Sequence, residues 1–188
     1  MSGEEFALQV AEHLARTDPG SEVSGVGVVK QNPDQSKHLA TACFRLCGLS
    51  LDVNSLRTET YAQDSRIPVT SLGTPLEDAL RRDFTVNALF YNLDAGRVED
   101  FTGGGLADLA ACTIRTPIPA GETFRDDPLR MLRAVRFASR LGFGLDAGLL
   151  DAASDAALHR QLEAKVSRER FGIEVDKMMR AQGARPVA

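Results

Sequence analysis

Residues 124–143 read FRDDPLRMLRAVRFASRLGF, and the spacing of charged and apolar residues in this stretch decides the fold of the second half of the chain. At about 100° per residue, its arginines fall on one side of a helix and its apolar side chains on the other. Two carboxylates, Asp126 and Asp127, lie at the start of the stretch. The pattern predicts a helix over about residues 126–141, with one side in the core and an arginine-rich side opposite.

The same stretch also suggests a chemistry. Asp127 and Arg130 are one helical turn apart, so they would present an acceptor and a set of N–H donors side by side. An amino group next to a ring acceptor, as on cytosine or adenine, matches that pair, and Arg133 and Arg136 would then meet phosphates. A solvated helix face, with acids in the first turn and local ion pairs, accounts for the same residues.

A second polar segment, LRRDFTVNALFYN at residues 80–92, follows a helix start at Thr74. If one helix continues through it, Asp83 and Asn87 share a face, because they are four residues apart. Their side chains could hold ribose hydroxyls while Arg82 holds phosphate. A surface helix with local hydrogen bonds is the alternative.

The amino-acid composition limits the classes of protein to which the chain can belong. The chain has 188 residues, of which 43% are hydrophobic and 26% charged, which excludes disordered and fibrous proteins. No run approaches the roughly 18–20 apolar residues of a membrane span. The formal net charge of −4 argues against a nucleic-acid binder with a basic surface throughout, although 18 of the 22 basic residues are arginines. Three cysteines without metal-ligand spacing fit a reducing, intracellular compartment.

The remaining segments alternate between the two periodicities of helix and strand. The order is a helix, then mixed strands and helices, then helices alone, which predicts an α+β fold. The expected elements are helices over residues 4–16, 146–158 and 166–180, and hairpins within 38–57 and 87–101.

Four motifs carry a family resemblance in their order and spacing. They are RRDFTVNALFYN (81–92), VEDFTGGGLADL (98–109), TFRDDPLRMLRAVRFASRLGF (123–143) and VSRERFGIEVDKMM (166–179). Together they resemble the class II tRNA nucleotidyltransferases (CCA-adding enzymes) and the bacterial-type poly(A) polymerases. Residues 32–61 resemble the eukaryotic branch of the CCA-adding enzymes. The resemblance covers nearly the whole chain and favours the nucleotide interpretation of both polar segments.

The resemblance implies a nucleotidyltransferase-type head with a small mixed β-sheet over residues 1–118. Part of an all-helical neck would follow over residues 119–188, with the nucleotide-reading helix at about 126–141. The implied activity is transfer of CMP and AMP from CTP and ATP to the tRNA 3′ end. A poly(A) polymerase head, or a non-catalytic nucleotide- or RNA-binding module, remains an alternative.

Site residues follow from the matching positions. Arg82, Asp83 and Asn87 match the family motif for ribose and triphosphate. Arg133 and Arg136 match the arginines that reach the triphosphate.

Base recognition and catalysis fall on other positions. Asp127 and Arg130 match the residues that pair with the Watson–Crick edge of the incoming nucleotide, and Asp126 stands where bacterial members usually have Glu. Asp52 matches a strand carboxylate near the metal site and is the candidate catalytic residue. Arg168 and Arg170, paired with Glu169 and Glu174, would brace the neck.

The family holds two Mg²⁺ ions with an Asp-x-Asp pair upstream of the segment that Met1–Phe6 resembles. We therefore expect the principal metal ligands to lie outside this chain, which would be a fragment truncated at both ends with little activity alone. A complementing polypeptide would then be a further partner. Cytoplasm is the expected compartment, or mitochondrion, plastid or nucleus if a preceding segment carries a transit peptide.

Overall fold

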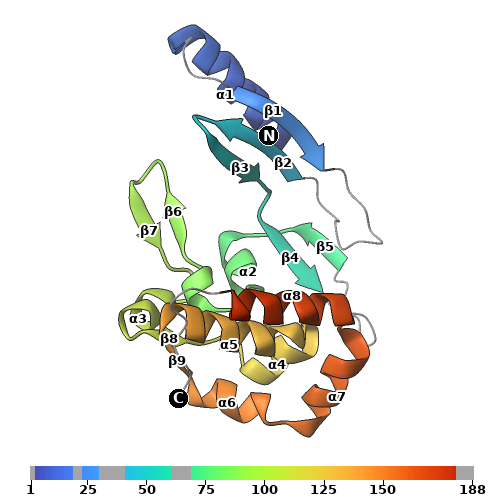
Figure 1. Ribbon diagram of the computed structural model, residues 1–188. Coiled ribbons are helices and arrows are strands. Elements are labelled where there is room, and N and C mark those ends of the chain that lie inside the picture. Colours follow the sequence, from blue (N-terminus) through green and yellow to red (C-terminus); the bar gives the residue numbers. More distant parts are fainter. Residues whose placement is uncertain (1–2, 19–22, 30–40, 61–68, 181–188) are drawn as a thin grey trace. The chain divides into compact units, whose positions relative to one another are not determined.

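The computed structural model describes residues 3–18, 23–29, 41–60 and 69–180 (Figure 1). The chain divides into two compact units. Unit 1 comprises Met1–Ala62 and Ile67–Thr74, and unit 2 comprises Gln63–Arg66 and Pro75–Ala188. The boundary between these two units differs from the head–neck boundary that the sequence predicts near residue 118. The head–neck boundary stays a prediction.

Unit 1 is a helix packed on a small antiparallel sheet. Its elements are α1 (Gly3–Thr17), β1 (Val23–Val29), β2 (Thr41–Leu46), β3 (Leu49–Val53), β4 (Arg57–Thr60) and β5 (Val69–Leu72). The sheet order is β1-β2-β3, β4 pairs with β5, and α1 contacts all three strands of the larger sheet. Ala42 and Phe44 of β2 are buried, as their alternation predicts.

The hairpin between β2 and β3 confirms the sequence prediction. Leu46 pairs with Leu49, and the two turn residues, Cys47 and Gly48, have φ values of 49° and 77°. A two-residue turn with positive φ at both positions matches the right-handed twist of the flanking strands.

Unit 2 is mostly helical. Its elements are α2 (Pro75–Leu80), the 3₁₀ helix η2 (Thr85–Asn87), β6 (Phe90–Asn92), β7 (Arg97–Glu99), α3 (Gly105–Ala110), β8 (Thr113–Ile114), α4 (Ala120–Asp126), α5 (Leu129–Leu141), β9 (Gly144–Leu145), α6 (Ala147–Ala153), α7 (Ala156–Lys165) and α8 (Arg168–Met179). The core is formed by Phe84, Ile114, Phe124, Met131, Ala134, Ala138, Leu149 and Leu158. Figure 1 shows α5 and α8 side by side, and they pack directly on each other. The α+β class predicted from the sequence is confirmed.

Three helix predictions were wrong in their boundaries. The helix expected over 126–141 is α5, which begins three residues later than expected, at Leu129, because Asp127 is extended before Pro128 and Asp126 is the last residue of α4. The helix expected near 146–158 is α6 and α7, each with its own aspartate N-cap. The helix expected to continue from Thr74 through residues 80–92 ends at Leu80.

The end of α5 agrees with its sequence. Gly142 follows Leu141 with a φ of 69°, and its N–H donates to the carbonyl oxygen of Ala138. A glycine in this left-handed conformation is the commonest way to end a helix.

The glycine-rich turn before α3 is organised by Asp100. One carboxylate oxygen accepts from the N–H and hydroxyl of Thr102 and from the N–H of Gly103, and the other accepts from the N–H of Leu106. Burial alone would raise the pKa of Asp100, but these hydrogen bonds outweigh burial and hold its pKa below the ordinary value.

We predict that Asp100→Ala lowers the free energy of unfolding by about 1–3 kcal/mol at neutral pH, because it removes the acceptor for four donors. The carboxylate contribution is fully present above the unfolded pKa of about 3.9 and is lost as the pH falls through the lower folded pKa. Urea unfolding at neutral and acid pH measures both effects. Asp94→Ala, at an exposed turn position, is the control, and equal losses in the two variants would contradict the prediction.

Candidate nucleotide-binding site

Seven of the eight predicted site residues lie in unit 2. They come from three places: the turn after α2, with η2; the junction between α4 and α5; and α5 itself. The residues are Arg82, Asp83, Asn87, Asp127, Arg130, Arg133 and Arg136. The eighth, Asp52, lies on β3 of unit 1.

Asp83 joins the turn after α2 to α5. One of its carboxylate oxygens accepts from the Asn87 amide at 3.1 Å and from the backbone N–H of Phe84 at 3.0 Å. The other accepts from Nε of Arg133 at 2.9 Å. The expected proximity of Asp83 and Asn87 is therefore present, although it arises from a turn into η2 and not from a continuous helix.

Asp127 and Arg130 are each held by a protein partner. Asp127 accepts from the backbone N–H of Leu129 at 3.2 Å and from Nη2 of Arg170 at 2.8 Å. Arg130 is 8% exposed, and its Nη2 donates to the carbonyl oxygen of Arg81 at 2.7 Å. Because Asp127 precedes α5 in an extended conformation, the pair does not share one helical face as the sequence analysis assumed.

Arg133 and Arg136 share a partner on α8. Glu174 accepts from Nε of Arg136 at 2.5 Å and lies 3.7 Å from Nη1 of Arg133. The Arg136 guanidinium also lies 4.3 Å from the centroid of the Phe137 ring. Arg136 and Glu174 are both buried, so the alternative of a solvated arginine face does not hold at this position.

Pairings within the neck also differ from the expectation. Glu174 pairs with Arg133, Arg136 and Lys177, and Arg170 pairs with Asp127. Spacing along the chain does not predict the pairs Arg136–Glu174 and Arg170–Asp127, because their members lie 38 and 43 residues apart.

A further buried carboxylate, Asp78, was missed although a local signal exists. It is three residues before Arg81 and four before Arg82, which is the spacing of ion pairs on a helix. The structure pairs it with both.

These contacts form three groups in unit 2: one around Asp78, one around Asp83 and Glu174, and the Asp127–Arg170 pair, which we together call the arginine–carboxylate network. Its members are Arg81, Arg82, Arg130, Arg133, Arg136, Arg170, Asp78, Asp83, Asp127 and Glu174. Five of these six guanidinium groups pair with the four carboxylates, and Arg130 binds a backbone carbonyl oxygen, so the named side chains carry more positive than negative charge. Such an excess favours an anionic ligand.

Among the described residues, no three His, Cys, Asp or Glu side chains come together as a metal site. Asp52 is exposed and faces Cys43 across the β2–β3 pair. A hydrogen bond with the Asp52 carboxylate, with smaller contributions from burial and charge, raises the pKa of the Cys43 thiol. This arrangement does not fit Mg²⁺, which prefers several oxygen ligands.

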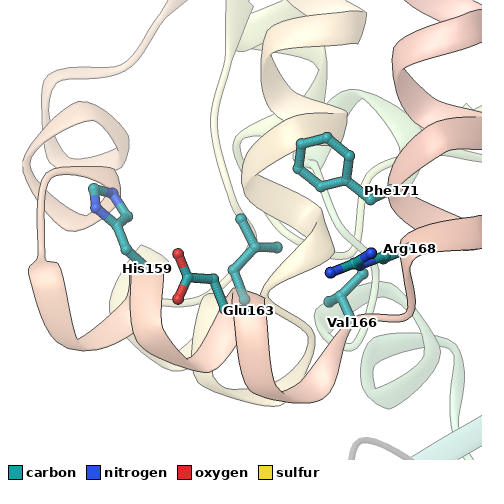
Figure 2. Close-up of a pocket in the computed structure, with 6 residues that line it drawn as sticks. His159, Glu163, Val166, Arg168 and Phe171 are labelled. Atoms are coloured by element: carbon teal, nitrogen blue, oxygen red, sulfur yellow. The ribbon is translucent and has the colours of Figure 1, made fainter.

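A separate cavity of about 600 Å³ lies at the junction of α7 and α8 (Figure 2). Leu162, Val166 and Phe171 provide its apolar lining, and the polar lining is His159, Glu163 and Arg168. Figure 2 shows the Glu163 carboxylate directed toward His159. None of the predicted site residues lines this cavity.

Comparison with known proteins identifies the class to which this fold belongs. The structure superposes on a CCA-adding enzyme in its apo form with a TM-score of 0.71 and 30% identity, covering 94% of this chain and 39% of the other. A second match is the Bacillus stearothermophilus CCA-adding enzyme in complex with CTP, with a TM-score of 0.65 and 27% identity over 97% of this chain and 50% of that one. The fold is thus that of a nucleotidyltransferase head and neck.

The family follows from the sequence match. Residues 1–115 match the family described as the poly A polymerase head domain, and the chain belongs to this family. A mitochondrial CCA tRNA nucleotidyltransferase of Candida glabrata is 48% identical over 183 residues, which are 95% of this chain and 34% of the relative. The chain spans about a third of the length of that relative. In the described residues, no helix has the length and apolar character needed to cross a membrane.

We predict that Glu174→Gln lowers the free energy of unfolding by about 3–5 kcal/mol, because it leaves the buried Arg136 guanidinium without its counter-charge. Asp176→Asn is the matched control on the same helix, since its pair with Arg180 is exposed and is expected to contribute about 0–1 kcal/mol. Urea unfolding of both variants measures the difference. A loss from Glu174→Gln no larger than that of the control would contradict a role for the pair in joining α5 to α8.

Proposed function

We propose that this chain is the nucleotide-selecting part of a CCA-adding tRNA nucleotidyltransferase, an enzyme that transfers CMP and AMP from CTP and ATP to the tRNA 3′ end. The arrangement of Asp83 and Arg133 supports the proposal most. They come from motifs 50 residues apart, the sequence assigned both to nucleotide binding, and they hydrogen-bond directly. The similarity to CCA-adding enzymes supports the choice of reaction.

Base selection is assigned to Asp127 and Arg130. The Asp127 carboxylate would accept from the amino group of cytosine or adenine, and Arg130 would donate to the neighbouring ring nitrogen. Guanine and uracil present the opposite order, a carbonyl oxygen and a ring N–H, which leaves like groups facing each other.

The hydrogen bonds with other protein groups orient Asp127 and Arg130 and leave part of their hydrogen-bonding capacity unused. A guanidinium has five N–H donors, and the bond from Arg130 to Arg81 uses one of them. A carboxylate has about four acceptor positions, and Leu129 and Arg170 occupy two on Asp127. Capacity therefore remains for a base.

Ribose and phosphates are assigned to the neighbouring residues. Asp83 and Asn87 would bind ribose hydroxyls, and Arg82, Arg133 and Arg136 would bind the triphosphate as charge-assisted donors. Positioned donors of this kind lower the cost of binding a highly charged ligand. We propose Mg²⁺ as the cofactor of the whole enzyme and the tRNA 3′ end as its acceptor substrate.

We predict that the 188-residue chain binds CTP and ATP weakly and discriminates against GTP and UTP. Asp127→Asn should weaken CTP binding by roughly tenfold and reduce the preference for CTP over UTP, because an amide can donate to the uracil carbonyl. Titration of the parent and the variant with the four nucleotides, followed by NMR, measures both effects.

Asp94→Asn, which removes an exposed charge outside the network, is the control for that titration. Equal binding of the four nucleotides by the parent would contradict the base assignment. Binding of ATP without CTP would instead favour a poly(A) polymerase head.

We predict negligible transfer of CMP to tRNA by the chain alone, because its described residues do not fit the catalytic metal ions. The assay follows incorporation of radiolabelled CMP into tRNA that lacks its terminal CCA, with and without Mg²⁺. A full-length CCA-adding enzyme serves as the positive control. Mg²⁺-dependent incorporation by the purified chain would contradict the prediction.

A further inference from the structure

Asp78 is a buried carboxylate that no nucleotide would touch. It lies in the last turn of α2 and is 1% exposed. One of its oxygens accepts from Nε and Nη2 of Arg81, at 3.0 and 2.5 Å. The other accepts from Nε and Nη2 of Arg82, at 3.1 and 2.7 Å. Each carboxylate oxygen therefore binds the Nε–Nη2 edge of a different guanidinium, one from Arg81 and the other from Arg82.

This arrangement fixes the direction of Arg82. Because the guanidinium is planar and its Nε–Nη2 edge faces Asp78, the Nη1 end points away from the carboxylate. The guanidinium carbon lies 5.5 Å from the centroid of the Phe90 ring, which restricts the group further. The Arg82 side chain nevertheless remains 38% exposed, so it is held in place and accessible at once.

Arg130 depends on the same carboxylate. Asp78 binds the Arg81 side chain, and the Arg81 backbone carbonyl accepts from Arg130 at 2.7 Å. Asp78 therefore contacts Arg82, which is assigned to the triphosphate, and is linked through Arg81 to Arg130, which is assigned to the base.

A purely structural role for Asp78 would need fewer ion-pair partners than the structure shows. A buried carboxylate must be paired, but one guanidinium in good geometry provides its counter-charge. The second guanidinium on Asp78 belongs to Arg82, the residue assigned to phosphate. An arginine side chain loses rotamer entropy when it is immobilised, and a partner that holds it before the ligand arrives removes part of this cost from binding.

We propose that Asp78 is a positioning residue that orients Arg82 toward the β- and γ-phosphates of the incoming nucleotide. The inference rests on the proposed function and goes beyond it by assigning triphosphate affinity to a residue outside the binding surface. Loss of Asp78 should lower the affinity for a nucleoside triphosphate strongly and the affinity for a nucleoside monophosphate little.

The test compares CTP and CMP binding in the parent chain and in Asp78→Asn. Asparagine keeps one acceptor oxygen but places an NH₂ group against one of the two guanidinium groups. We expect CTP affinity to fall roughly tenfold and CMP affinity by less than about twofold, because only CTP needs the oriented Arg82. NMR titration gives both dissociation constants, and thermal unfolding of each variant gives its stability.

Asp108→Asn is the matched control. Asp108 is also buried in unit 2, where it accepts from the Thr85 hydroxyl at 2.7 Å and pairs with Arg115 at 3.2 Å. Its loss should destabilise the chain in a similar way and leave the ratio of CTP to CMP affinity unchanged. A fall of that ratio in both variants would overturn the inference, since a general structural defect would explain it.

Two further variants keep the test decisive. Asp78→Glu retains the charge and displaces both guanidinium groups by one methylene, so it should lower the ratio to an intermediate value and serve if Asp78→Asn does not fold. In an Arg82→Gln background, Asp78→Asn should leave the ratio unchanged, because Asp78 would act through Arg82.

The outcomes separate the two proposals. A parent chain that binds no CTP overturns the proposed function and this inference with it. A parent chain that binds CTP, together with an unchanged CTP to CMP ratio in the Asp78 variants, overturns the inference alone.

Discussion

The ion pair between Arg136 of α5 and Glu174 of α8 is the contact on which the helical part of the structure depends. Both side chains are less than 10% exposed, and the Nε of Arg136 lies 2.5 Å from a Glu174 oxygen. Two buried charges are tolerated only when each is paired and hydrogen-bonded, so neither helix can shift along the other without a large penalty. Because Arg133 lies one turn before Arg136 and also reaches Glu174, the pair determines where the exposed part of α5 points.

The same rule explains the rest of the network. Several guanidinium groups close together, as the proposed function requires for a triphosphate, repel one another when no ligand is present. Asp78, Asp83, Asp127 and Glu174 reduce that repulsion, because each forms an ion pair with at least one of the arginines. The carboxylates thus stabilise the fold and orient the donors with the same hydrogen bonds.

Local sequence patterns predicted a large part of the fold. The β2–β3 hairpin, the β6–β7 hairpin and α8 follow from periodicity and turn residues, because their hydrogen bonds are formed between near neighbours. The break at Asp127 was missed although Pro128 restricts the preceding residue, since the apolar periodicity of the flanking residues hides it. The partners of Asp127 and Arg136 could not be predicted, because they depend on how α8 packs against α5 and not on spacing along the chain.

The net charge of −4 describes the whole chain poorly for the same reason. Acidic residues such as Asp94, Asp151 and Asp176 are exposed, where their effect on a site is screened by solvent and salt. In the network the arginines outnumber the carboxylates, and several members are buried, where screening is weak. A nucleoside triphosphate would bring the negative charge that this group of side chains lacks. A site that is oriented in advance by its own carboxylates and still positive overall can therefore be stable when empty and attract a nucleotide.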